Sequence, residues 1–309
     1  MDVTNSNFKE LLPEIKNVIN SASFICLDGE FTGLSNADNI ASFATPSEYF
    51  CKLRSSALDF LVVQFGLSAF RKEDSGKRYT NKTYNFYLFP RQLNRQARDR
   101  RFLCQASSLT FLTEHGFDFN KLFREGISYL TQSDEDNLKE VFAEKQKWKE
   151  ANASTTNCAK IPVPSKLQST VDQAVNSIKE LLRPDCEKSE GKLIVGHNML
   201  LDICHIINAF LDPLPSDYHE FKEMVHALFP NLVDTKFMCS EEPLNDLVPS
   251  TVLEHLLNTV HKRPFILPEI INGEEKCTFN LNKDNLLHHA GYDAFITGIC
   301  FLSTLHYLG

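Results

Sequence analysis

The sequence lacks the features of several large protein classes. No stretch of about 18 residues is both free of charge and predominantly apolar, so no transmembrane helix is expected. Residues Met1 to Lys9 are polar and contain no apolar run of the kind found in a secretory signal. None of the nine cysteines forms a C-x-x-C pair, which argues against a zinc site and a disulfide framework. These absences favour a reducing compartment, and we expect a cytoplasmic or nuclear protein.

Basic residues are fewer than acidic ones, 32 against 40. The formal net charge is −8, whereas proteins that bind nucleic acids usually carry a basic surface. Acidic residues that hold metal ions would add to the negative total while still serving a polyanionic substrate. One short segment concentrates positive charge: Arg91, Arg95, Arg98, Arg100 and Arg101. This segment is either a solvated loop or a phosphate contact.

The chain is long enough for one large domain or two small ones. Hydrophobic periodicity predicts an amphipathic helix over residues 8–19, then strands over 23–27, 57–70 and 83–89, and later short strands over 192–195 and 232–233. It predicts helices over 107–114, 119–123, 131–148, 169–182, 199–210, 217–229, 253–260 and 284–305, and the polar composition of 151–164 indicates a linker. This order predicts an α/β or α+β layer fold, with a mixed sheet and helices on both faces.

Two acidic residues lie at the end of the first predicted strand. Asp28 and Glu30 are two residues apart, so their side chains point to the same face. Two adjacent carboxylates repel each other unless a positive group lies between them. Oxygen ligands of this kind suit Mg²⁺ or Mn²⁺. The alternative is a solvated strand end without function.

Two further acidic residues occur in apolar helices. Asp202 lies in an almost wholly apolar segment, where a carboxylate is a helix cap, half of a buried ion pair, or functional. Asp293 opens the last apolar helix and follows His288 and His289. Neutral imidazole suits proton abstraction near neutral pH, although such a histidine can also be a helix cap or a packed ring.

Together these residues suggest a phosphodiester hydrolase. Four acids and one histidine match the requirements of two-metal hydrolysis, in which ions about 3.5–4 Å apart activate water and stabilise the leaving oxygen. No single one of these motifs would be specific. Each of the four acids, however, lies at the edge of an apolar element.

Several motifs resemble one known family. They are FICLDGEFTGL (24–34), QFGL (64–67), NFYLFP (85–90), GFDFNKLF (116–123), GHNMLLD (196–202), EFKEM (220–224), DTK (234–236) and HHAGYD (288–293). These motifs, spread over nearly the whole chain, resemble the poly(A)-specific ribonuclease family, a group of DEDDh 3′→5′ exoribonucleases that includes deadenylases and small-RNA trimmers. The resemblance implies an RNase H-like α/β fold, with a mixed central sheet flanked by helices.

The resemblance also implies an activity and a site. It implies removal of 3′ nucleotides from single-stranded RNA as 5′-nucleoside monophosphates. Two Mg²⁺ ions, for which Mn²⁺ can substitute, would be held by Asp28, Glu30, Asp202 and Asp293. The general base of the family lies five residues before the last acid, at His288. Helical geometry alone would favour His289, one turn from Asp293, so His288 is expected to precede the helix or lie at a bend.

The family stacks 3′-terminal adenines on apolar and aromatic side chains. The matching positions are Phe31, Leu34, Leu109, Phe111 and Phe119, and Lys236 would contact phosphate. Stacking tolerates many base sequences, so these residues would hold the strand more than read it. Phe31 and Phe119 could equally be core residues. The family further implies a homodimer.

Two departures from the family bear on the substrate. We expect the helical nucleic-acid-binding insert to be shortened around residues 131–190, and we expect no RNA-recognition motif after Gly309. We therefore expect a single exonuclease domain over residues 1–309, without cap stimulation, that either removes poly(A) or trims small RNAs. The alternatives are a catalytically idle RNA-binding or scaffold module, and a phosphatase or DNA exonuclease of related fold.

Overall fold

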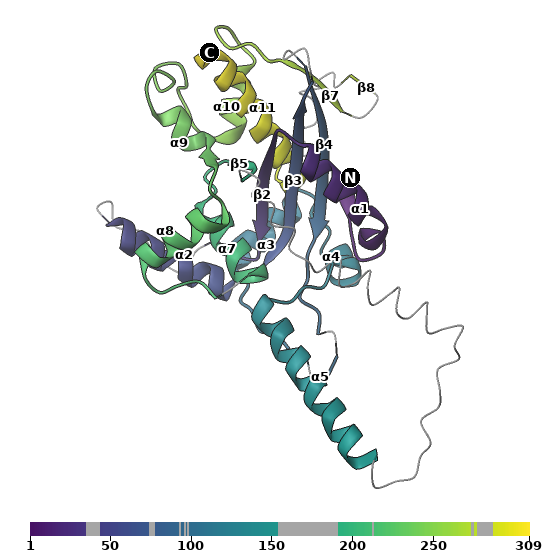
Figure 1. Cartoon of the computed structure of the whole chain (residues 1–309). Helices are drawn as coiled ribbons and strands as arrows, with labels where there is room; N and C mark the ends of the chain where they lie inside the picture. The colour runs from purple at the N-terminus through teal and green to yellow at the C-terminus, as the bar shows by residue number, and fades with distance from the viewer. Residues whose placement is uncertain are drawn as a thin grey trace. The chain divides into compact units, whose positions relative to one another are not determined.

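A computed structural model describes residues 1–34, 44–73, 78–92, 94–95, 97, 99–153, 191–211, 213–272, 275–276 and 287–309 (Figure 1). The chain divides into two compact units, Met1–Asp134 with Lys192–Gly309, and Glu135–Gly191. The first unit contains the sheet and every predicted site residue. The described part of the second is mainly helix α5 (Gln132–Ala153), which includes three residues of the predicted linker. The rest of that linker and the helix predicted over 169–182 lie outside the described residues.

A mixed β-sheet forms the centre of the first unit. Its strand order is β6 (Leu232–Asp234), β5 (Leu193–Gly196), β2 (Phe24–Phe31), β3 (Val62–Lys72), β4 (Arg78–Tyr87), β7 (Glu269–Asn272) and β8 (Glu275–Lys276), and β1 (Asp2–Val3) pairs with β4. Strands β2, β3 and β4 form an antiparallel meander. Strands β5 and β6 add in parallel beside β2. The predicted mixed sheet flanked by helices is confirmed.

The helices of this unit agree with most of the predicted segments. They are α1 (Phe8–Ser21), α2 (Pro46–Asp59), α3 (Ala106–Glu114), α4 (Phe119–Glu125), α7 (Leu200–Phe210), α8 (Tyr218–Leu228), α9 (Thr235–Ser240), α10 (Leu253–Val260) and α11 (Ala290–Leu308). No described helix combines the length and apolarity needed to cross a bilayer. The six cysteines in the described residues are free thiols.

Several predicted boundaries were wrong, and β2, β4 and α5 are each longer than predicted. Residues 57–59 belong to helix α2 and not to a strand, and α2 itself was missed. Its start signal is present in the sequence, because Thr45 and Glu48 form a capping box around Pro46. The last helix begins at Ala290 and not at 284, and residues 284–286 lie outside the described part of the chain.

Strand β2 separates two parts of the core. Phe24 and Cys26 pack into the cluster that contains the buried residues of α11, whereas Ile25 and Leu27 pack into the cluster that contains Ile15 of α1. Side chains alternate between the two faces of a strand. Asp28 and Glu30 therefore continue the face covered by α11, and this alternation aims both acids at the same helix.

Candidate active site

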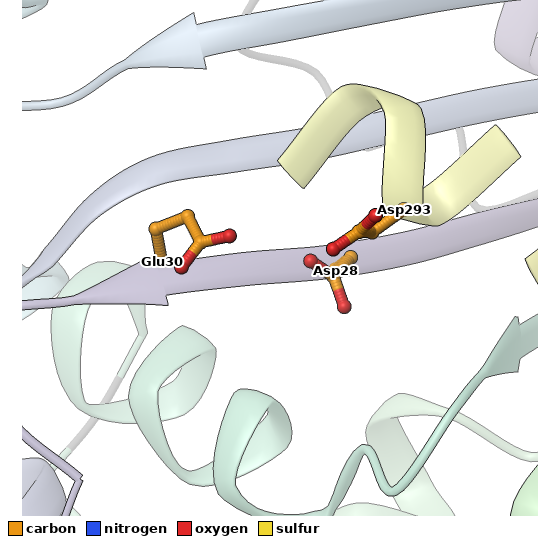
Figure 2. Close-up of side chains that lie close together, drawn as sticks. All are labelled: Asp28, Glu30 and Asp293. Carbon is orange, nitrogen blue, oxygen red and sulfur yellow. The ribbon is translucent and has the colours of Figure 1, made fainter. Parts of the chain in front are cut away.

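Three acidic side chains from two elements meet at the end of strand β2. Asp28 and Glu30 extend from β2, and Asp293 extends from the first turn of α11 (Figure 2). One carboxylate oxygen from each lies within 4.8 Å of the others. Asp293 is 8% exposed, while Asp28 and Glu30 are only half-buried, so solvent reaches part of the group. Such an arrangement can hold a metal ion.

Close contact between α11 and strand β3 brings Asp293 to this position. Gly66 of β3 pairs with Asp28. A Cβ atom at Gly66 would lie 1.9 Å from the carbonyl oxygen of Ala290, so only glycine lets the helix approach this closely.

The sheet also caps this helix. His289 occupies the N-cap position of α11 without a side-chain capping bond. Instead, the backbone N–H of Ala290 donates to Gln64 Oε1 over 2.9 Å, and that of Gly291 donates to Asn85 Oδ1 over 3.1 Å. Gln64, Gly66 and Asn85 all lie in the motifs that resemble the family, but the sequence alone predicted no role for them.

Asp202 approaches the site from helix α7. It lies in the first turn, and its Oδ1 would be 3.0 Å from a Cβ atom at Gly29. Gly29, between the two acids of β2, therefore leaves room for the fourth carboxylate. Asp202 is not part of the group joined within 4.8 Å, but it raises the pKa of both Asp28 and Glu30. The four predicted acids thus converge, three of them in close contact.

Asp234 holds the turn that precedes α7. Its carboxylate accepts hydrogen bonds from the backbone N–H groups of Asn198 (3.0 Å) and Met199 (2.9 Å). It also accepts from Lys236 N (2.9 Å) and so caps α9. Asn198 has a φ of 59°, in the left-handed region that asparagine tolerates. Asp234 belongs to the DTK motif, but this structural role could not be predicted from the motif.

The electrostatics of the four acids favour a bound cation. Burial raises the pKa of Asp28 and of Glu30 well above the usual range, and repulsion from the other carboxylates adds to the effect. Burial also raises the pKa of Asp202 to about 8 and of Asp293 to about 7. Asp293 Oδ1 is buried without a hydrogen-bond partner among the described residues. A divalent cation would neutralise this charge and satisfy that oxygen, so these residues fit a metal ion.

His288 precedes the last helix, next to the N-cap residue His289, as its spacing from Asp293 predicted. Its φ of 65° turns the chain into the N-terminus of α11. The backbone N–H of His288 hydrogen-bonds to the Asp293 carboxylate and lowers the pKa of that group. Burial, with a contribution from His115, lowers the pKa of His288, while Glu254 acts in the opposite direction. The imidazole is therefore held toward its neutral form.

His289 has different surroundings. Its backbone carbonyl accepts the N–H of Asp293 over 3.0 Å, which begins the helix. Burial lowers the pKa of its ring, and the charges of Asp2, His115 and Lys121 also act on it. Of these residues, Asp2 lies in β1 and Lys121 lies in α4. This setting gives no reason to prefer His289 over His288.

The residues predicted to contact RNA differ in accessibility. Phe31 is buried, and its ring stacks on that of His205 with centroids 4.1 Å apart, which favours the core alternative for this residue. Leu34 and Phe111 are exposed at 55% and 40%. Leu109 and Phe119 line an apolar pocket of about 470 Å³, together with Thr32 and Phe102 among others. Lys236 is exposed, with Nζ 3.4 Å from Asn198 Oδ1.

The arginine-rich segment is partly engaged in packing. Arg91 donates hydrogen bonds to the backbone carbonyls of Phe123 and Arg124. The charge of Arg100 contributes to the low pKa of the buried His205, which is about 3 mainly because of burial. Arg98 lies outside the described residues.

Comparison with known proteins places these features in a family. Residues 3–301 match the model of the CAF1 family ribonucleases. Human poly(A)-specific ribonuclease PARN is 33% identical over an alignment that covers 100% of this chain and 62% of that protein. Mouse poly(A)-specific ribonuclease PNLDC1 is 27% identical, with 100% of this chain and 72% of that protein covered. This chain therefore spans about three fifths of the length of human PARN.

Solved structures support the fold. The S. pombe Pop2p structure, determined with Mg²⁺ and Mn²⁺ bound, matches with a TM-score of 0.56 at 19% identity, covering 97% of this chain and 90% of that one. The RNase domain of yeast Pop2 also gives a TM-score of 0.56, at 15% identity. The predicted RNase H-like architecture is confirmed.

Proposed function

This chain belongs to the CAF1 family of ribonucleases, and we propose that it is a metal-dependent 3′→5′ exoribonuclease acting on single-stranded RNA. The observation that carries this proposal is the convergence of Asp28, Glu30, Asp202 and Asp293, with His288 beside them. Partly or fully buried carboxylates that have raised pKa values, and no positive partner among the described residues, are costly to the fold and so indicate a functional site. Release of 5′-nucleoside monophosphates from the 3′ end is the proposed reaction.

The four carboxylates would hold two Mg²⁺ ions, for which Mn²⁺ can substitute. A partly exposed acidic cluster, and an oxygen of Asp293 without a hydrogen-bond partner among the described residues, support this assignment. When bound, such ions supply Lewis-acid activation of water and charge stabilisation at the leaving oxygen. The Mg²⁺ and Mn²⁺ named for S. pombe Pop2p suggest which metals to test.

His288 would take up the proton that the attacking water releases. A ring nitrogen of His288 accepts the proton of the attacking water while the water oxygen bonds to the terminal phosphorus. The bond between this phosphorus and the 3′ oxygen of the preceding nucleotide breaks. That oxygen takes up a proton from the solvent and becomes the new 3′ hydroxyl. The lowered pKa of His288 keeps the base unprotonated at neutral pH.

The substrate would be either a poly(A) tail or the 3′ end of a small RNA. The names of PARN and PNLDC1, both poly(A)-specific ribonucleases, support an adenine-rich 3′ end. Leu34 and Phe111 offer exposed apolar surface for base stacking, Leu109 and Phe119 line the neighbouring pocket, and Lys236 would contact phosphate. Phe31 would contribute indirectly, through its packing on His205.

We also propose a homodimer in the cytoplasm or nucleus. The free thiols of the described cysteines are consistent with a reducing compartment. Sedimentation velocity of the full chain tests the homodimer, since a dimer would sediment as a species with twice the mass of the 35.2 kDa chain. Localisation of the tagged protein in cells tests the compartment.

The test of function uses 5′-labelled oligonucleotides of three kinds. RNA ending in oligo(A), RNA of mixed sequence and DNA of matched sequence are each incubated with the protein and Mg²⁺. A ladder that shortens from the 3′ end on RNA supports the proposal, and its restriction to oligo(A) selects deadenylation over small-RNA trimming. Binding of RNA without cleavage would instead identify an idle module, and cleavage of DNA alone would identify a DNA exonuclease.

A further inference from the structure

Two rings from one segment of the chain enclose the imidazole of His288. The ring centroid of His288 lies 4.3 Å from that of His115 and 4.6 Å from that of Phe111. The interplanar angles are 75° and 69°, so both contacts are edge-to-face. Phe111 belongs to helix α3, and His115 is the residue at its C-cap.

His115 is itself fixed by the end of this helix. Its Nδ1 lies 2.8 Å from the carbonyl oxygen of Phe111, and its backbone N–H donates to the same oxygen over 3.1 Å. A carbonyl oxygen can only accept, so Nδ1 carries the hydrogen. The half-buried ring of His115 is therefore held in one orientation by its own helix.

The orientation of the His288 ring depends on neighbouring side chains, because the backbone of His288 is itself in an uncommon conformation. A φ of 65° is uncommon for a residue with a side chain, and conformations of this kind persist only where the surroundings fix them. A general base must also point its nitrogen at the attacking water within hydrogen-bond reach. We propose that His115 is a positioning residue: its ring, together with Phe111, fixes the direction in which the His288 imidazole faces. This inference rests on the proposed function, because it assigns His288 the role of base.

A competing explanation is that His115 only caps helix α3. Two substitutions separate the two roles. His115→Phe keeps a ring beside His288 but loses the bond from Nδ1 to the Phe111 carbonyl. His115→Asn keeps an N–H donor close to that carbonyl but removes the ring. His226→Asn, at an exposed position of α8, is the matched control.

The experiment measures kcat and KM for RNA cleavage, together with the thermal unfolding midpoint of each variant. We expect His115→Asn to lower kcat roughly ten- to hundredfold with KM unchanged, since small misplacements of a catalytic group have effects of this size. We expect His115→Phe to lose less than about threefold in kcat, even if its unfolding midpoint falls. The His226→Asn control should match the wild type.

Coupling to His288 gives a second readout. If His115 acts through His288, adding His115→Asn to His288→Ala should cause no further loss of the residual rate. An equal loss in both backgrounds would overturn the inference. So would a fully active His115→Asn variant, or one in which only KM rises. A wild-type protein that cleaves no RNA would refute the proposed function itself, which distinguishes the two failures.

Discussion

The side-chain oxygen of Gln64 accepts a hydrogen bond of 2.9 Å from the backbone N–H of Ala290, 226 residues further along the chain. Gln64 pairs with Glu30 across the sheet, just as Gly66 pairs with Asp28. The residues of β3 that anchor helix α11 are thus the direct neighbours of the two acids of β2. The same short stretch of β3 therefore sets the distance between Asp293 and both of its partners.

This anchoring predicts a loss of stability on replacement of Gln64 by leucine. The buried N–H of Ala290 would lose its partner, which typically costs about 1–3 kcal/mol. The free energy of unfolding, measured by chemical denaturation in EDTA, should fall by that amount. RNA cleavage should fall as well, because the first turn of α11 carries Asp293.

The control for this prediction is Asn258→Ala, an exposed position of α10. Its effect should be within about 0.5 kcal/mol. Asn85→Ala, which removes the acceptor for the Gly291 N–H, should behave like Gln64→Leu. If Gln64→Leu were as stable as the control, the sheet would not anchor the helix.

Metal binding should appear as a gain in stability. A ligand that binds only the folded state stabilises it by about 2.7 kcal/mol at a concentration 100 times its Kd. Mg²⁺ should therefore raise the unfolding midpoint of the wild type but not that of Asp28→Asn. In EDTA the same variant should be at least as stable as the wild type, because the repulsion of Asp28 by Asp293 is removed.

Asp246→Asn is the matched control, since Asp246 is exposed and lies outside the acidic group in the described residues. It should retain the full response to Mg²⁺. An undiminished response in Asp28→Asn would show that the metal binds elsewhere.

The raised pKa values predict how stability depends on pH without metal. In the folded protein the pKa is about 7 for Asp293 and about 8 for Asp202, against an ordinary value of 3.8. Between these values the folded state binds more protons than the unfolded chain, so its stability falls as the pH rises. In EDTA the free energy of unfolding should decrease from about pH 5 to about pH 8.

Denaturant titrations at several pH values check this. Asp293→Asn should reduce the slope, and saturating Mg²⁺ should abolish or reverse it, because the metal favours the ionised carboxylates. A wild-type stability that stays constant or rises over this range in EDTA would contradict the assigned pKa shifts.

The sequence predicted which acidic residues converge better than it predicted the contacts that position them. The four acids could be identified because a carboxylate at the edge of an apolar element is unusual. Their common direction on β2 followed from the two-residue period of a strand. The spacing rule also placed His288 before the helix, as the structure has it.

The supporting contacts could not be predicted, since they join distant positions. Nothing local in the sequence links Gln64 to Ala290, Asn85 to Gly291, or His115 to His288. Asp234 looked like one member of a short motif, yet its two oxygens bind a turn 35 and 36 residues earlier. Phe31 resembled a stacking residue, but it lies on the same face of β2 as Leu27 and packs into the core beside it.

The most direct test of the account is cleavage of 5′-labelled RNA by the wild type and by single Asp→Asn or Glu→Gln variants at positions 28, 30, 202 and 293. With Mg²⁺ the wild type should produce a ladder shortening from the 3′ end and release 5′-nucleoside monophosphates. EDTA should abolish this activity, and each variant should lose at least about a hundredfold in rate while remaining folded. Undiminished cleavage in any one of the variants, or in EDTA, would contradict the assignment of these carboxylates to a metal-dependent exonuclease site.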